Sequence, residues 1–285
     1  MRSFTSPDFT LVLGSGGVKS IAGLGAMEVF EQEGLQPAAV TGCSAGAIFG
    51  ALIAAGHPAQ RGMQMARDLW SRDITSRKRH RALLEVALPR LAGFDDRFAL
   101  RDDSLICHQL QVAFGATRIE DLPTPLRVQA TCATTGAPVV LRRGPLTQAL
   151  RASVALPFLF APQRIDGQLL VDGSLSDPLP VDATPPGHVT VALGFRVPFP
   201  RNANTASRLA TRITAALSNN LLEARLASAD ASRMVLMLPE LPRHIGLFDT
   251  DAMPELIEIG RQAARAALPR LRLLLGNAVR LSATA

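Results

Sequence analysis

Two glycine-rich segments near the start of the chain require tight backbone turns. Gly42, Ser44 and Gly46 belong to a Gly-x-Ser-x-Gly motif, in which the serine stands on a sharp turn between a strand and a helix and exposes its hydroxyl. The upstream segment 14–19 reads Gly-Ser-Gly-Gly-Val-Lys, and its backbone N–H groups can be aimed at an oxyanion. Together the two segments indicate a serine hydrolase.

The residues around these segments predict alternating strands and helices. Apolar spacing and chain breakers indicate a strand at 11–13, a helix at 21–32, a strand at 38–41 and a helix at 45–55. Such a succession is typical of a parallel sheet with helices on both faces. We therefore expect an α/β protein of three layers, with a mostly parallel central sheet between the helices.

The rest of the chain continues this pattern after one interruption. We expect strands at 126–133, 139–142, 169–171, 188–195 and 234–238, and long helices at 205–229 and 254–275. Residues 58–115 differ, because they carry charged helical segments that we expect to form a cap and to supply pocket walls. The 285 residues, 1–285, fit a single domain that includes this cap.

A basic run within the expected cap bears on membrane contact. Residues 77–81 read Arg-Lys-Arg-His-Arg and precede apolar residues at helical spacing up to Leu91. An amphipathic helix of this kind can lie on a lipid interface, and an ordinary surface helix has the same pattern. Both interpretations stay open.

The net charge of the chain predicts attraction to anionic partners. It is +6, and the calculated pI is about 10.4, which suits an anionic membrane surface or nucleic acid. Aromatic residues make up only 5% of the chain, and tyrosine is absent. These features disfavour nucleic acid. We favour a solvated, arginine-rich surface as the explanation of the basic runs.

We expect neither disulfides nor a metal or other cofactor. The odd number of cysteines, 3, gives no disulfide framework, and no Cys or His spacing resembles a metal site. Residues 34–60 lack charge, but glycines and Pro58 interrupt them short of the ~20 apolar residues of a membrane-spanning helix. The first residues lack the apolar core of a signal peptide. We expect a cytoplasmic or peripheral membrane protein, of open oligomeric state.

The sequence offers two kinds of base for Ser44. A serine hydroxyl becomes a good nucleophile only when a neighbouring group takes its proton. A Ser-Asp-His triad would combine Asp172 with His188 or His244, but α/β hydrolases place the nucleophile after several strands, whereas Ser44 follows the second. Asp172 alone, at the end of an expected strand and before Gly173, can serve if burial raises its pKa. We favour this Ser-Asp dyad.

The glycine loop, the motif serine and the Asp-Gly strand end, in this order, resemble the patatin-like phospholipase family, its small bacterial members above all. Segments 11–56, 148–157 and 166–181 extend the resemblance to most of the chain. It implies a patatin-like fold and a serine hydrolase of carboxylic esters of lipids, of the phospholipase A, lysophospholipase or carboxylesterase type.

The resemblance also assigns roles to individual residues. Ser44 would be the nucleophile and Asp172 the base, and the N–H groups around Gly16, Gly17 and Val18 would form the oxyanion hole. The supporting motif positions are Gly14, Lys19, Gly42, Gly46 and Gly173. A lipid or another ester is the implied substrate.

The chain departs from the family pattern at three serines. The family loop usually reads Gly-Gly-Gly-x-Arg/Lys-Gly, whereas Ser15 and Ser20 stand at its first and last glycine positions. Ser174 replaces the small residue after Asp-Gly. Lys19 matches the basic position, where it either fixes the loop, meets a phosphate or is an ordinary surface lysine. A shifted loop would reduce the rate more than the fold.

The same residues disfavour nucleotide binding and leave two other functions open. Lys19 stands where the third glycine of a dinucleotide fingerprint belongs, and Val18 replaces the glycine that a P-loop requires before Lys-Ser. An acyl thioesterase or acyltransferase would use the same site with a different acyl acceptor. A catalytically weak or inactive lipid-binding or regulatory protein would keep the fold without the activity. The head group, acyl length and position of the ester stay open.

Overall fold

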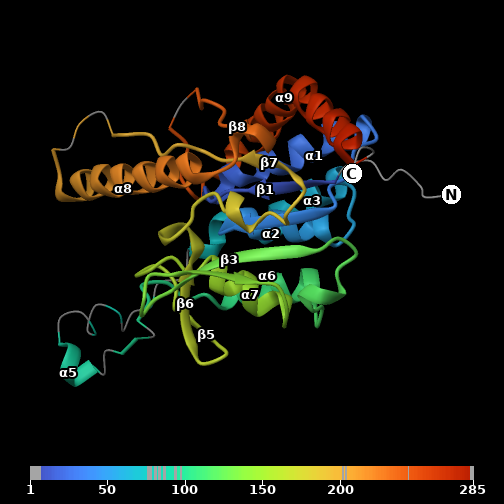
Figure 1. Ribbon diagram of the computed structural model, residues 1–285. Helices are drawn as coiled ribbons and strands as arrows, with labels where there is room; N and C mark the ends of the chain where they lie inside the picture. The colour runs from blue at the N-terminus through green and yellow to red at the C-terminus, as the bar shows by residue number, and fades with distance from the viewer. Residues whose placement is uncertain are drawn as a thin grey trace.

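A central sheet organises the chain (Figure 1). The computed structural model describes residues 8–75, 79, 82, 85, 88–92, 95–96, 98–200, 202, 204–242 and 244–282. Within them the strands are β1 (Phe9–Leu13), β2 (Ala39–Cys43), β3 (Leu126–Cys132), β4 (Pro138–Leu141), β5 (Gln163–Ile165), β6 (Gln168–Asp172), β7 (Val189–Leu193) and β8 (Met234–Met237).

The sheet is mixed and mostly parallel. Its order is β5-β6-β3-β2-β1-β7-β8, with β4 paired to β3 outside this path. Strands β3, β2, β1, β7 and β8 run parallel, whereas β4, β5 and β6 pair antiparallel at one side. Because β6 runs against β3, its last residue, Asp172, pairs with Ala130 inside β3. This brings the carboxylate to the middle of the sheet, close to the end of β2.

Helices cover both faces of the sheet. The described helices are α1 (Ala22–Gln32), α2 (Ala45–Ala54), α3 (Ala59–Leu69), α5 (Pro89–Ala92), α6 (Ser104–Phe114), α7 (Leu146–Ser153), α8 (Ala206–Ser228) and α9 (Met253–Ser282). Alternate residues of β1 show the two faces. Leu11 and Leu13 join the main core with residues of α1, α2 and α9, and Val12 packs with Leu222 of α8. The three layers expected from the sequence are thus confirmed.

The segment expected to form a cap packs largely into the main core where it is described. Met63 and Leu69 of α3 and Leu110 of α6 are buried in that core. The basic run 77–81 lies outside the described residues except for Arg79, so the amphipathic interpretation of this segment stays a prediction. In the described part of the chain, no helix has both the length and the apolar character needed to span a membrane.

Candidate active site

The turn at Ser44 is the one that the Gly-x-Ser-x-Gly motif predicts. Strand β2 ends at Cys43 and α2 begins at Ala45. Ser44 between them has φ 55° and ψ −132°, a backbone conformation that is costly for a side-chain-bearing residue and typical of functional sites. A Cβ at Gly42 would lie 2.4 Å from the Ala47 Cα, and a Cβ at Gly46 would lie 2.4 Å from the Leu13 carbonyl oxygen. Only glycine fits at either position.

The backbone of this turn is held from the neighbouring helix. The Ser44 N–H donates to the Ser153 Oγ at 2.8 Å, and that hydroxyl donates to the Gln129 carbonyl oxygen at 2.6 Å. Ser153 is the last residue of α7 and is fully buried. The strained turn is therefore tied to β3 through one hydroxyl, a contact that the sequence pattern does not reveal.

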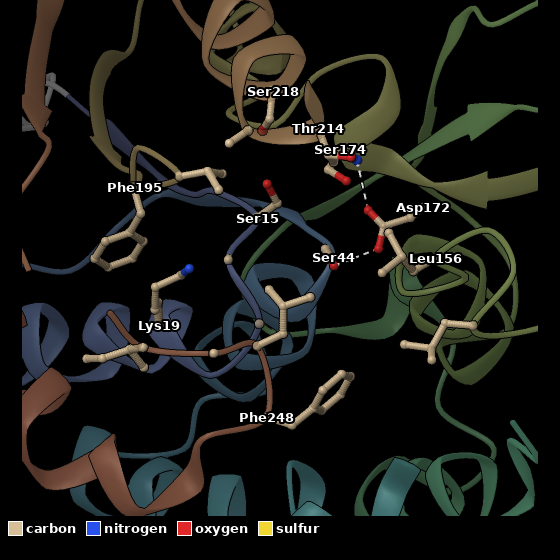
Figure 2. Close-up of a pocket in the computed structure, with 18 of the residues that line it drawn as sticks. Ser15, Lys19, Ser44, Leu156, Asp172, Ser174, Phe195, Thr214, Ser218 and Phe248 are labelled. Atoms are coloured by element: carbon tan, nitrogen blue, oxygen red, sulfur yellow. Dashed lines mark hydrogen bonds between the residues drawn. The ribbon is translucent and has the colours of Figure 1, made fainter. Parts of the chain in front are cut away.

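Ser44 and Asp172 meet through a direct hydrogen bond. The Ser44 Oγ donates to the Asp172 Oδ2 at 2.7 Å, and the Ser174 N–H donates to Oδ1 at 2.9 Å (Figure 2). A Cβ at Gly173 would lie 2.4 Å from the Gln129 carbonyl oxygen, so the turn after β6 can pass close to β3 only with glycine there. Both oxygens of the carboxylate thus have fixed donors.

Burial adjusts the proton affinity of this carboxylate. Asp172 is 2% exposed. Burial raises the pKa of Asp172, and the hydrogen bonds from the Ser174 N–H and the Ser44 hydroxyl oppose that rise in pKa. A carboxylate with a raised pKa that accepts a hydrogen bond from a serine can take the proton of that serine. A Ser-Asp dyad requires this of its carboxylate.

The glycine loop lies against the same cavity and is partly covered. Gly17 has φ 62°, and a Cβ there would lie 2.5 Å from the Leu247 carbonyl oxygen. The Val18 N–H donates to that oxygen at 2.8 Å. No acceptor among the described residues is found for the N–H groups of Gly16 and Gly17. Of the amides expected to form an oxyanion hole, these two are the ones free in this conformation.

The segment that covers the loop is itself fixed. The Leu247 carbonyl oxygen also accepts the indole N–H of Trp70 at 2.9 Å. The Trp70 ring stacks on Phe248 with ring centroids 5.4 Å apart. The hydrogen bond from Trp70 to Leu247 joins positions that lie 177 residues apart in the chain, which explains why no local motif predicted it.

The serine positions of the loop do not strain it. Neither Ser15 nor Ser20 has a positive φ, and the Ser20 hydroxyl donates to the Gly14 carbonyl oxygen at 2.8 Å. Lys19 is buried, 4% exposed, and lines the cavity. Burial lowers the pKa of the Lys19 ammonium, and no charged neighbour contributes to the shift. This cation therefore faces the cavity without a counter-ion among the described residues.

The loop and the Ser44–Asp172 pair open into one cavity of about 530 Å³, a volume typical of ligand pockets. Much of its wall is apolar: Trp70, Val154, Leu156, Leu159, Phe160, Phe195, Ile245, Leu247 and Phe248. The expectation that residues 58–115 supply the walls is wrong for the described residues, because only Trp70 among them lines the cavity. Helix α8 and the segment 244–248 take that place.

The two histidines considered for a triad lie in different places. His188 precedes β7, at the opposite end of the parallel strands from Ser44, and its Nδ1 lies 3.0 Å from the Thr10 hydroxyl. His244 lines the cavity, but the Ser44 hydroxyl donates to Asp172. Within the part of the chain that the structure describes, no group of three or more His, Cys, Asp or Glu side chains could hold a metal ion.

Comparison with known proteins points to one family. The family model described as patatin-like phospholipase matches residues 11–185. An uncharacterized NTE family protein of Mycobacterium tuberculosis is 34% identical over 181 residues, which are 64% of this chain and 46% of that protein. Patatin-like phospholipase domain-containing protein 6 of Mus musculus is 32% identical over 185 residues, 64% of this chain and 13% of that protein.

The relatives are longer proteins, and a solved structure shares the fold. The chain spans about half the length, 46% to 47%, of the mycobacterial relatives that it matches. The crystal structure of VipD from Legionella pneumophila superimposes with a TM-score of 0.51 at 16% identity, over 93% of this chain and 67% of that chain. This likeness bears on the arrangement of the sheet and its helices.

Proposed function

Because the chain belongs to the patatin-like phospholipase family, we propose that it is a serine lipid acyl hydrolase with Ser44 as nucleophile and Asp172 as base. Family membership supports a lipid hydrolase in general. The observation that carries the finer proposal is the hydrogen bond of 2.7 Å from the Ser44 hydroxyl to the buried Asp172 carboxylate. A direct bond of this kind lets the carboxylate take the proton with no histidine between them.

The proposed reaction has two halves. In the first, Asp172 accepts the Ser44 proton while Oγ attacks the ester carbonyl carbon, and the tetrahedral intermediate carries a negative oxygen. The intermediate collapses as the carbon–oxygen bond to the leaving alcohol breaks, and Asp172 returns the proton to that alcohol. In the second half a water molecule gives a proton to Asp172 and attacks the acyl carbon. The second intermediate collapses as the bond from the acyl carbon to the Ser44 Oγ breaks, Oγ takes the proton back from Asp172, and the carboxylic acid leaves.

Stabilisation of the negative oxygen is assigned to the glycine loop. The unoccupied N–H groups of Gly16 and Gly17 are the proposed donors. Helix α2 begins directly after Ser44, and the positive end of its dipole further stabilises the negative charge on the oxygen. Val18 would join them only if the Leu247 carbonyl moved away, because its N–H is occupied.

The cavity supports a lipid ester as the substrate. Its apolar wall suits an acyl chain, and the buried Lys19 ammonium suits an anionic head group such as a phosphate. We therefore propose phospholipids or lysophospholipids as the preferred esters, with uncharged monoacylglycerols as weaker ones.

A fluorophosphonate probe tests the nucleophile. We expect the probe to label the folded protein and the label to disappear in Ser44→Ala. It should persist in Ser218→Ala, the matched control, because Ser218 lines the same cavity from α8. Absence of label on the folded wild-type protein would contradict the proposal and favour a lipid-binding protein without activity. A panel of phospholipids, lysophospholipids, monoacylglycerols, short nitrophenyl esters and acyl thioesters then identifies the substrate class.

A further inference from the structure

Helix α8 exposes a stripe of large apolar side chains. Leu209, Ile213 and Leu217 follow one another at four-residue spacing and are 49%, 53% and 66% exposed. Such a stripe ordinarily faces the core of a protein. Here the N-terminal half of α8 extends away from the body of the molecule (Figure 1), and residues 208–214 of the helix are all exposed. This apolar surface is therefore open in the described structure.

The stripe borders a side of the cavity that opens to solvent, because Ala210 and Thr214 line the cavity and are themselves exposed. The residues one position after its members, Ala210, Thr214 and Ser218, line the cavity that holds Ser44. Figure 2 shows Thr214 and Ser218 on the side of the cavity near Ser15 and Ser174. Because successive residues of an α-helix are about 100° apart around its axis, the wall of the cavity and the open stripe are neighbouring faces of one helix.

The other flank of the stripe is basic. Arg208 and Arg212 stand one position before Leu209 and Ile213, and thus on the flank of the stripe opposite to Ala210, Thr214 and Ser218. Residues 197–222 contain three arginines and no aspartate or glutamate. A surface that is apolar along its centre and cationic along one edge matches the boundary between anionic head groups and acyl chains.

We propose that α8 docks on an anionic lipid surface, with the stripe of Leu209, Ile213 and Leu217 inserted at the interface and Arg208 and Arg212 at the phosphates. Docking in this orientation brings the open side of the cavity to the layer from which a lipid ester would be drawn. The inference rests on the proposed function for its purpose, and it adds α8 to residues 77–91 as a candidate membrane contact.

A second copy of the chain fits this surface less well. In a two-fold contact each copy would contribute the same segment, so the interface would gather Arg208 and Arg212 of both copies without a carboxylate from residues 206–222 of α8. Like charges that are brought together in this way disfavour association. An anionic lipid surface supplies the missing negative charge.

Vesicle flotation with the full chain tests the proposal. We expect binding to vesicles of phosphatidylcholine with phosphatidylglycerol and little binding to phosphatidylcholine alone. The double variant Ile213→Glu, Leu217→Glu should lose about tenfold or more of the affinity for the anionic vesicles. The matched control is Leu273→Glu on α9, since Leu273 is also 53% exposed, and it should bind as the wild type does. Circular dichroism and thermal unfolding verify that each variant is folded.

A soluble ester separates this inference from the proposed function. Hydrolysis of a short, monomeric nitrophenyl ester should stay within about twofold of wild type in the α8 variant, because neither substituted residue lines the cavity. Hydrolysis of that ester without vesicle binding would overturn docking and leave the enzyme standing. Vesicle binding that needs the stripe, without any hydrolysis, would support docking and overturn the proposed function. Equal loss of binding in Leu273→Glu, or a dimer that only the α8 variant dissociates, would overturn docking.

Discussion

The Ser44 hydroxyl donates to the Asp172 carboxylate at 2.7 Å although the two residues lie 128 positions apart in the chain. Two turns make this meeting possible. One is the strained turn between β2 and α2, and the other follows β6, which runs antiparallel to β3 and ends beside it. Each turn requires glycine for close passage of the backbone, at Gly42 and Gly46 in one and at Gly173 in the other.

Gly17→Ala tests the glycine loop. A Cβ at this position would meet the Leu247 carbonyl oxygen at 2.5 Å and would stand on a backbone with φ 62°. The loop must then shift, and we expect kcat for a soluble ester to fall by about 10²–10³, the usual cost of losing one oxyanion donor. Gly34→Ala is the control, because Gly34 has φ 69° but no atom within 4 Å of the added Cβ. Equal kcat in the two variants would contradict the assignment of the loop.

Ser153→Ala tests how the nucleophile turn is held. The substitution removes the acceptor of the Ser44 N–H and the donor to the Gln129 carbonyl. Leaving buried polar groups unpaired costs about 1–3 kcal/mol each, so both the free energy of unfolding and kcat should fall. Ser228→Ala provides the comparison, since its hydroxyl is exposed and donates to the Arg225 carbonyl within the same helix. If the two variants show the same free energy of unfolding and the same kcat, the hydrogen bonds of Ser153 do not hold the turn.

Asp177→Asn tests a buried carboxylate five residues after Asp172. Burial raises the pKa of Asp177 to about 6, and Arg225 opposes this rise in pKa. The folded state therefore holds this proton more tightly than the unfolded chain, and stability falls as the pH rises from about 4 to about 6. The variant lacks this loss, so at pH 7.5 its free energy of unfolding should exceed that of the wild type by up to about 3 kcal/mol. Near pH 4 the two should differ little.

Urea unfolding at both pH values measures this difference. The exposed Asp121 serves as control, because it does not contribute to the raised pKa of Asp177, and Asp121→Asn should keep the wild-type difference in stability between the two pH values. An equal effect of Asp177→Asn at pH 4 and at pH 7.5 would show that the carboxyl is not titrating in this range.

Lys19→Met tests recognition of an anionic head group. Methionine keeps much of the length of the side chain and removes the charge that faces the cavity. A lost hydrogen bond to a charged group is worth about 1.5–3 kcal/mol, so kcat/KM for a phospholipid should fall about 10-fold to 100-fold. For an uncharged monoacylglycerol we expect little change. A parallel fall for both substrates would assign Lys19 to the loop structure instead.

The sequence predicted the parts of the site that local rules govern. The turn at Ser44 and the end of β6 at Asp172 each follow from a strand, a glycine and a polar residue within a few positions, and both lie where they were expected. The contact of Leu247 with Val18 depends on segments more than 200 residues apart, and no motif marks it. The spacing of Leu209 and Ile213 predicts a helix, but a core-facing stripe and a solvent-facing stripe have the same spacing, so the exposure of these side chains could not be predicted.

Separate substitution of Asp172 and His244, with hydrolysis of a soluble ester as the measurement, tests the proposed dyad most directly, because both residues line the cavity of Ser44. We predict that Asp172→Asn lowers kcat/KM by about 10²–10⁴, the usual share of a general base, and that His244→Ala changes it by no more than a few-fold. A loss in His244→Ala as large as that in Asp172→Asn would contradict the dyad and restore the triad.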